Sequence, residues 1–227
     1  MSDAGPPVIA IDGPAGSGKG TIAQGVAQAL GFHYLDSGSL YRLVALKALE
    51  AGIPLDDAPR LAQAAAGMAT TFSGGRVELD GVDVTTAIRS PAVSAAASQI
   101  AVHPEVRRTL LARQRAFRRP PGLVADGRDM GTVVFPDASL KVYVTASAEE
   151  RAKRRYKQLI EKGNPVTLAG LLREIRERDA RDSARAAAPL RVAADAIVLD
   201  TTDMSIDASI AFVLERFRAL RAQRNSS

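Results

Sequence analysis

The fold of this chain is decided by one stretch near its start, Gly13-Pro14-Ala15-Gly16-Ser17-Gly18-Lys19-Gly20-Thr21. A short apolar run, Val8-Ile9-Ala10-Ile11, precedes it, and a helix-like stretch follows from Ile22 to Leu30. Strand, glycine-rich loop and helix in this order form the context of a phosphate-binding P-loop. The backbone N–H groups of such a loop make a concave anion site, and the helix adds the positive end of its dipole. The stretch therefore predicts that residues 13–21 bind phosphate groups and that Lys19 reaches the outermost ones.

One position of the loop departs from the general P-loop pattern. Gly20 follows Lys19 where the pattern has Ser or Thr, and the hydroxyl arrives one residue later, at Thr21. The alternative interpretation is a glycine-rich turn that holds no ligand. Because both the spacing and the flanking strand and helix match the motif, we favour the phosphate-binding loop.

The composition is that of a globular protein with one core, or with a core and a small inserted domain. The chain has 227 residues, of which 46% are hydrophobic and 24% charged. It lacks cysteine, which excludes disulfides and thiolate metal sites, and its two histidines, His33 and His103, are too far apart in sequence to favour a zinc site. No apolar run is long enough to span a bilayer, and residues 1–7 lack the pattern of a signal peptide. We therefore expect a cytoplasmic protein without membrane contact.

The charge balance favours an anionic ligand. The net charge is +5, and 24 of the 30 basic residues are Arg, whose planar fork suits phosphate and carboxylate groups. A solvated basic surface is the simpler alternative. Nucleic acid also fits the charge, but only 4% of the residues are aromatic and none is Trp, so platforms for stacked bases are scarce.

Short apolar strands alternate with helical segments along most of the chain. The predicted strands are Val8–Asp12, Phe32–Asp36, Leu123–Asp126, Leu140–Thr145 and Ala196–Asp200. Five such strands joined by helices predict an α/β fold, with a five-stranded parallel sheet covered by helices on both faces. Ligands of such sheets bind beyond the carboxyl ends of the strands. We therefore expect the P-loop, Asp36-Ser37-Gly38 and the segment after Leu123–Asp126 to converge.

The predicted secondary structure changes near residue 69, where short strands replace the alternation of strands and helices. Thr70–Phe72, Arg76–Leu79 and Val82–Val84 are short strands separated by Ser73-Gly74-Gly75 and Asp80-Gly81, which predicts an antiparallel meander. With its flanking helices, this meander is interpreted as a small subdomain, residues 58–103, inserted into a single domain of residues 1–227.

Two charged clusters follow predicted strands. In Asp36-Ser37-Gly38-Ser39-Leu40-Tyr41-Arg42, Ser37 is expected to cap a helix, and Arg42 is either a surface residue or the holder of a second phosphate. In Asp126-Gly127-Arg128-Asp129, two carboxylates flank one Arg. This is either a turn with a local salt bridge or a cluster that meets a polar ligand.

A third cluster is the basic region of residues 151–185. Arg154 and Arg155 precede a break at Gly163-Asn164-Pro165, and Arg178, Asp182 and Arg185 follow it at spacings that share one helical face. Such runs are often only solvated charged helices. Beside a P-loop, they are also what a closing, cation-rich lid requires.

Several motifs of the chain together resemble one family. GPAGSGKGT, with Gly20 before Thr21, is similar to the P-loop of nucleoside monophosphate kinases. DSGSLYR, SQIAVHPEVRR, DGRDMGTVVFP and ERDARDSARAAAPL resemble the bacterial cytidylate kinases, and the resemblance extends from about Val8 to the last helix. It implies a P-loop NTPase-type fold, an NMP-binding insert at residues 58–103, a lid at residues 151–185 and transfer of the γ-phosphoryl group of ATP to CMP or dCMP with Mg²⁺.

The resemblance also implies roles for individual residues. ATP phosphates are held by residues 13–21 and by Arg154 and Arg155 of the lid, and Thr21 approaches Mg²⁺, with Asp126 as a second candidate. Lys19, Arg128, Asp129 and Arg185 are expected to be catalytic. The expected CMP contacts are Ser37, Tyr41, Arg42, Ser98, Arg107, Asp126, Arg128, Asp129, Arg178, Asp182 and Arg185. Ser98, Arg107 and Asp129 face cytosine, whose amino group donates to a carboxylate and whose ring acceptors suit a guanidinium. We expect a monomer that binds small molecules.

Three alternatives remain open at this point. A UMP or AMP kinase would use the same parts with a different base reader. A P-loop ATPase or nucleotide switch would use Asp126 as the carboxylate that ends its Walker B strand. That function would leave the dense Arg/Asp clusters without a purpose. A basic nucleic-acid-binding module would show binding that weakens steeply with salt.

Overall fold

The computed structural model describes residues 5–161, 163 and 165–225. The chain divides into two compact units. The first contains the residues up to Leu35 and from Phe117 onward, and the second runs from Asp36 to Ala116. The second unit is thus wider than the predicted insert of residues 58–103. The middle residue of the predicted break at Gly163-Asn164-Pro165 lies outside the described residues.

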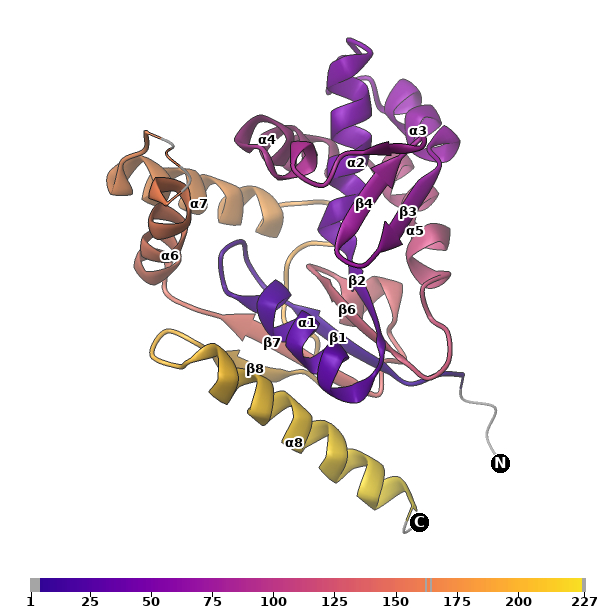
Figure 1. The fold of residues 1–227 in the computed structure, drawn as a ribbon, viewed down its shortest axis with the longest axis vertical. Helices are drawn as coiled ribbons and strands as arrows, with labels where there is room; N and C mark the ends of the chain where they lie inside the picture. Colours follow the sequence, from indigo (N-terminus) through magenta and orange to yellow (C-terminus); the bar gives the residue numbers. More distant parts are fainter. Residues whose placement is uncertain (1–4, 162, 164, 226–227) are drawn as a thin grey trace. The chain divides into compact units, whose positions relative to one another are not determined.

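The first unit is built on a five-stranded parallel sheet (Figure 1). The order across the sheet is β2-β6-β1-β7-β8, so β1 lies at the centre. The strands are β1 (Val8–Asp12), β2 (His33–Asp36), β6 (Leu123–Gly127), β7 (Leu140–Thr145) and β8 (Ile197–Asp200). In register, Asp12 at the end of β1 is paired with Gly127 of β6 on one side and with Tyr143 of β7 on the other. The carboxyl ends of three strands therefore meet at one edge, beside the P-loop.

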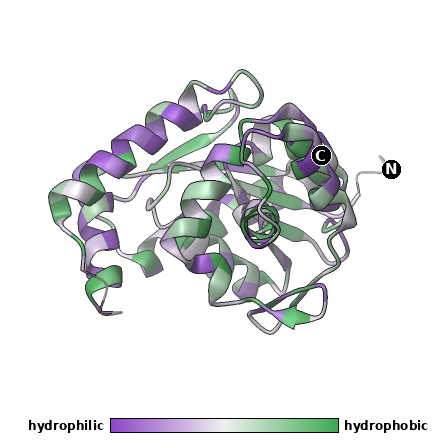
Figure 2. Ribbon diagram, turned by 90° about the horizontal axis from the view of Figure 1, so that it is seen from above, coloured by the Kyte–Doolittle hydropathy of each residue, from purple (hydrophilic) through white to green (hydrophobic). Residues whose placement is uncertain are grey.

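On one face of this sheet, a hydrophobic cluster packs against two helices. Ile9 and Ile11 point toward α1 (Lys19–Leu30) and α8 (Ile206–Asn225), and both strand residues are fully buried. Phe217 belongs to this cluster, and Phe32 packs against it. Their ring centroids are 5.7 Å apart in an edge-to-face contact. Figure 1 shows the two helices side by side along the sheet. Figure 2 shows the strands mostly in hydrophobic colours, as a sheet that is buried on both faces requires.

Three further helical segments complete the first unit. The π-helix η2 (Met130–Val134) packs against β1 and β6, and α6 (Ala148–Ile160) packs against α7 (Leu168–Ser183). The helices begin where the sequence supplies caps: Ser147 accepts from the N–H of Glu150, and Thr167 accepts from that of Gly170.

The second unit combines helices with a small antiparallel sheet. Its sheet has the order β3-β4-β5, and Asp57 and Ser90 cap two of its helices. Its elements are α2 (Ser37–Glu50), α3 (Ala58–Gly67), β3 (Thr70–Ser73), β4 (Arg76–Leu79), β5 (Val82–Asp83), the 3₁₀ helix η1 (Ala87–Arg89), α4 (Pro91–Ile100) and α5 (Pro104–Arg115).

The predicted fold class is confirmed, including the parallel sheet and the antiparallel meander. Two short elements, η1 and η2, were not predicted, because turns of three to five residues carry no periodicity of their own. Among the described residues, no helix is both long enough and apolar enough to cross a membrane.

Candidate active site

The P-loop lies between β1 and α1, as its sequence predicts. Gly18 immediately precedes the helix with a φ of 85°, a left-handed conformation that glycine adopts at no steric cost. Ser17 is fully buried, and within the described part of the chain its hydroxyl oxygen has no hydrogen-bond partner. A buried hydroxyl without a partner is costly unless a ligand supplies one. The loop is therefore suited to surround phosphate oxygens.

Lys19 is held at the mouth of this loop. Its Nζ lies 3.5 Å from the carbonyl oxygen of Pro14 and 3.6 Å from a carboxylate oxygen of Asp126 at the end of β6. Both side chains are largely buried, with exposed fractions of 12% and 8%. The amine is thus positioned by a neighbouring strand rather than left in solvent.

The structure leaves little space for a side chain after Lys19. A Cβ at Gly20 would lie 3.0 Å from Oδ2 of Asp126, which is tighter than nine in ten real Cβ contacts. The hydroxyl moves instead to Thr21, which is exposed on the first turn of α1. The donor set, one carboxylate and one hydroxyl beside a phosphate-binding loop, fits Mg²⁺, which keeps several waters and is otherwise held by substrate phosphates. Within the described residues, no three acidic or histidine side chains form a metal site by themselves.

Asp12 is a site residue that the sequence did not reveal. It ends β1 and is buried, and its two carboxylate oxygens accept from the backbone N–H groups of Met130 and Gly131, each at 2.8 Å. These bonds fix the start of η2, directly after Asp129. The two amides lie more than a hundred residues further along the chain. Local sequence therefore could not predict this contact, which depends on the pairing of β1 with β6. Burial, with smaller contributions from Asp129 and Asp126, raises the pKa of Asp12 to about 7 against the opposing N–H bonds.

This pKa makes stability dependent on pH. The folded protein holds the Asp12 proton more tightly than the unfolded chain, so this contribution is complete below pH 4 and is lost as pH rises to about 7. The free energy of unfolding is expected to fall by roughly 4 kcal/mol at most across that window. Urea titrations at stepped pH measure it. The Asp12→Asn variant should lose this part of the slope, and an identical slope in both proteins would contradict the assignment.

A second cluster gathers around Asp182 near the end of α7. Its carboxylate, with an exposed fraction of 1%, accepts from Nε of Arg128 at 3.0 Å and from Nη2 of Arg185. Burial opposes ionisation, but Arg128, Arg185 and Arg178 together lower the pKa of Asp182. Two predicted clusters, one after β6 and one on the basic helix, are thus joined by one buried carboxylate. The predicted helical spacing is wrong for Arg185, because α7 ends at Ser183, although Arg185 still bonds to Asp182.

Helix α6 contacts the P-loop through Arg151, a residue to which the sequence assigned no individual role. Arg151 forms a two-pronged salt bridge with Asp179, at 3.0 and 2.6 Å, and its Nη1 also donates to the carbonyl of Ala15 at 3.1 Å. Arg154 donates to the backbone carbonyl of Thr201 at 2.5 Å and to its hydroxyl at 3.2 Å. Arg155 and Arg178 are half-buried on α6 and α7.

The second unit holds the remaining predicted residues. The N-cap of α2 is Asp36, whose side chain accepts from the backbone N–H and the hydroxyl of Ser39, so the predicted cap at Ser37 is wrong. Asp36 can make these bonds because its extended backbone precedes the first helical residue, Ser37. Arg42 lies 3.4 Å from the same carboxylate.

Two more of the predicted residues in the second unit lie close together. The guanidinium of Arg107 lies 5.7 Å from the ring centre of Tyr41 and also donates to the carbonyl of Ala101. Ser98 is buried on α4. The structure thus brings Tyr41 and Arg107 together within this unit.

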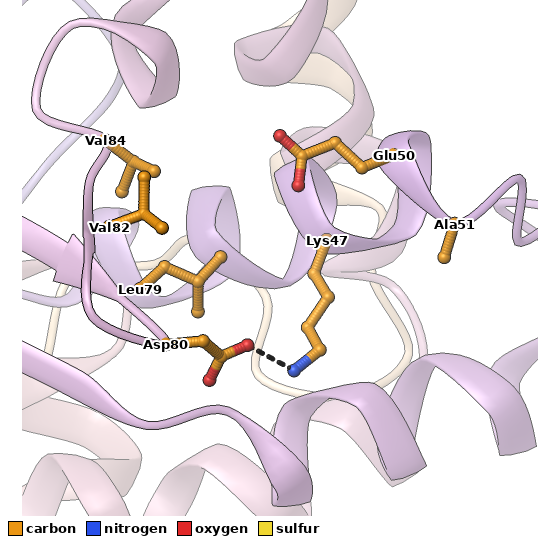
Figure 3. A pocket seen from close by; sticks show the side chains of 7 residues that line it. All are labelled: Lys47, Glu50, Ala51, Leu79, Asp80, Val82 and Val84. Carbon is orange, nitrogen blue, oxygen red and sulfur yellow. Dashed lines mark hydrogen bonds and ion pairs between the residues drawn. The ribbon is translucent and has the colours of Figure 1, made fainter.

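A shallow pocket of about 450 Å³ lies elsewhere in the second unit and contains none of the predicted site residues. It is lined by Lys47, Glu50, Ala51, Leu79, Asp80, Val82 and Val84 (Figure 3). An ion pair of 2.7 Å between Lys47 and Asp80 crosses it and ties the turn after β4 to α2. The ion pair therefore links two elements of the second unit, and both of its residues line the pocket.

Comparisons with known proteins show the family of the chain. The sequence profile of the family described as cytidylate kinase matches residues 9–219. A cytidylate kinase of Paraburkholderia phymatum is 58% identical over 217 residues, covering 96% of this chain and 95% of the relative. One of Burkholderia cenocepacia is 59% identical over 214 residues, covering 94% of each. A solved gluconokinase from Sinorhizobium meliloti 1021, 16% identical, shares the fold with a TM-score of 0.50 over 98% of both chains. The chain belongs to the cytidylate kinase family.

Proposed function

We propose that this enzyme transfers the γ-phosphoryl group of ATP to CMP or dCMP, giving ADP and CDP or dCDP. An oxygen of the CMP phosphate attacks the γ-phosphorus while the bond from that phosphorus to the bridging oxygen of ADP breaks. The attacking oxygen is already ionised at neutral pH, so no side chain has to act as a general base. Catalysis then rests on positioning and on neutralising charge.

The observation that carries the proposal is that cationic side chains gather at two places in the first unit. We assign one phosphate group to each place. Lys19 and the P-loop amides form the first, and the pair Arg128 and Arg185, bridged by Asp182, forms the second. A nucleotide switch needs only the first. A kinase with a phosphorylated acceptor needs both, and Arg suits the second because its fork matches phosphate oxygens.

We assign the other contacts by the family resemblance. Residues 13–21, Arg154 and Arg155 hold ATP, and residues 151–185 act as the lid. Ser37, Tyr41, Arg42, Ser98 and Arg107 contact CMP, with residues 58–103 as the NMP-binding insert. Arg178 and Asp182 lie near the sugar. Thr21, with Asp126 as a second candidate, would hold Mg²⁺, which would neutralise charge on the phosphates. The protein is proposed to work in the cytoplasm as a monomer that does not bind nucleic acid.

The direct test is ADP formation from Mg·ATP with CMP, dCMP, UMP and AMP offered separately. Turnover confined to CMP and dCMP is expected. Equal turnover with UMP would retain the kinase and remove the cytosine assignment. Turnover that needs no acceptor would instead point to an ATPase.

Base selection is expected to depend on Asp129. The carboxylate of Asp129, buried at the start of η2, accepts from the amino group of cytosine in this assignment, whereas uracil presents an oxygen there. Asp129→Ala should therefore lower the ratio of kcat/KM for CMP over UMP by about 10- to 100-fold. Asp137→Ala removes an exposed carboxylate and serves as the control. An unchanged ratio in Asp129→Ala would assign base reading to another residue.

A further inference from the structure

Two carbonyl groups of the P-loop accept hydrogen bonds from outside the loop. The carbonyl of Ala15 accepts from Nη1 of Arg151 on α6 at 3.1 Å. The carbonyl of Ser17 accepts from the hydroxyl of Thr201, just after β8, at 3.1 Å. Both donors come from segments more than 130 residues away, and neither belongs to the residues that the sequence assigned to ATP.

These bonds constrain the direction of the neighbouring amides. A trans peptide unit is planar, and its C=O and N–H point in opposite directions. A carbonyl of residue 15 directed at Arg151 therefore directs the N–H of Gly16 away from Arg151. The carbonyl of residue 17 does the same for the N–H of Gly18. Amides of this loop are the groups that bind phosphate.

The donors are themselves rigidly held. The side chain of Arg151 has an exposed fraction of 5%, its Nε donates to the carbonyl of Ala146 at 3.0 Å, and its fork grips Asp179 of α7. Its backbone is also close to the loop, since a Cβ at Gly16 would lie 3.3 Å from the Cβ of Arg151.

The Thr201 anchor is equally constrained. This residue is buried, its N–H donates to the carbonyl of Thr145 at 2.8 Å, and its hydroxyl accepts from Arg154 at 3.2 Å. The hydroxyl oxygen also lies 3.1 Å from the Thr145 carbonyl, so its single proton serves Ser17 or Thr145 at any moment.

We propose that Arg151 and Thr201 are positioning residues that preset the amide groups of the P-loop for the phosphates of ATP. Arg151 also links the loop, through Asp179, to the helix that carries Asp182. The inference rests on the proposed binding of ATP at this loop. Without these anchors the peptide planes rotate more freely, so binding must order them first and affinity falls.

The test measures affinity for a non-hydrolysable Mg·ATP analogue by titration calorimetry, without acceptor. Arg151→Lys keeps the charge but loses the fork, so it cannot hold Ala15, Ala146 and Asp179 together; the Kd is expected to rise about 10-fold. Arg118→Lys is the matched control, because Arg118 likewise holds a carboxylate, that of Asp137 at 2.6 Å, and a backbone carbonyl, that of Pro6 at 2.8 Å, and neither partner belongs to the P-loop. Its affinity should equal that of the wild type.

A second pair of variants decides the matter if Arg151→Lys folds poorly. Thr201→Val keeps the shape and removes the hydroxyl, and should raise the Kd about fivefold, while Thr201→Ser should restore it. The KM for CMP should stay unchanged in all of these. Wild-type affinity in Arg151→Lys and Thr201→Val, or an equal loss in Arg118→Lys, would overturn the proposal. Wild-type protein that binds the analogue but does not phosphorylate CMP would refute the proposed acceptor and leave the positioning role standing.

Discussion

Replacing Lys19 with methionine is expected to lower kcat by about 10²- to 10³-fold, the usual cost of removing one donor that stabilises charge in the transition state. Methionine has nearly the length of lysine without its charge, so the loop keeps its packing. The phosphoryl group then moves without the cation that Pro14 and Asp126 hold at the mouth of the loop. Single-turnover kinetics with saturating Mg·ATP and CMP measure the loss.

A matched variant separates charge loss at the site from charge loss in general. Lys47→Met removes a lysine that pairs with Asp80 in the second unit, and it should leave kcat unchanged. Circular dichroism of both variants checks that the fold is retained. A kcat within a fewfold of wild type in Lys19→Met would remove the P-loop lysine from the mechanism.

Local patterns in the sequence were sufficient to predict the fold. The five strands are short apolar runs, the P-loop has a fixed spacing, and the turns Ser73-Gly74-Gly75 and Asp80-Gly81 separate the strands of the meander. Each of these signals lies within about ten residues, so it can be read without the tertiary structure.

The contacts that organise the site are long-range, and no local pattern reports them. Asp12 binds amides of η2 through the register of β1 and β6, and Arg151 meets Ala15 because α6 packs on the P-loop. A sequence shows that residues 151–185 are basic, but it does not show with which carboxylate each Arg forms a salt bridge. The error at Ser37 has the same origin on a smaller scale. Two adjacent residues both had side chains suited to capping, and the backbone conformation at Asp36 decided between them.

Replacing Asp182 with asparagine is expected to weaken both the fold and the binding of CMP. The carboxylate is almost fully buried between Arg128 and Arg185, and removing one partner of a buried ion pair leaves uncompensated charge. We expect a loss of roughly 3 kcal/mol, or a fall in Tm of about 10 °C, and a drop in kcat/KM for CMP of about 100-fold. Because the pKa of Asp182 is lowered, its contribution is present in full at neutral pH and is lost only as pH falls through that lowered value. Assays at pH 7 therefore measure all of it.

Inorganic phosphate distinguishes a structural carboxylate from one that presents arginines to a phosphate. In Asp182→Asn, Arg128 and Arg185 lose their anionic partner, so added phosphate should raise the Tm of the variant more than that of the wild type. Glu149→Gln is the control, because it removes a carboxylate from the exposed pair with Arg176, which is also on α7. This control should leave the Tm nearly unchanged and give no response to phosphate beyond that of the wild type. If phosphate stabilises Asp182→Asn no more than the wild type, the two arginines do not form an anion site, and the phosphate of CMP must be held elsewhere.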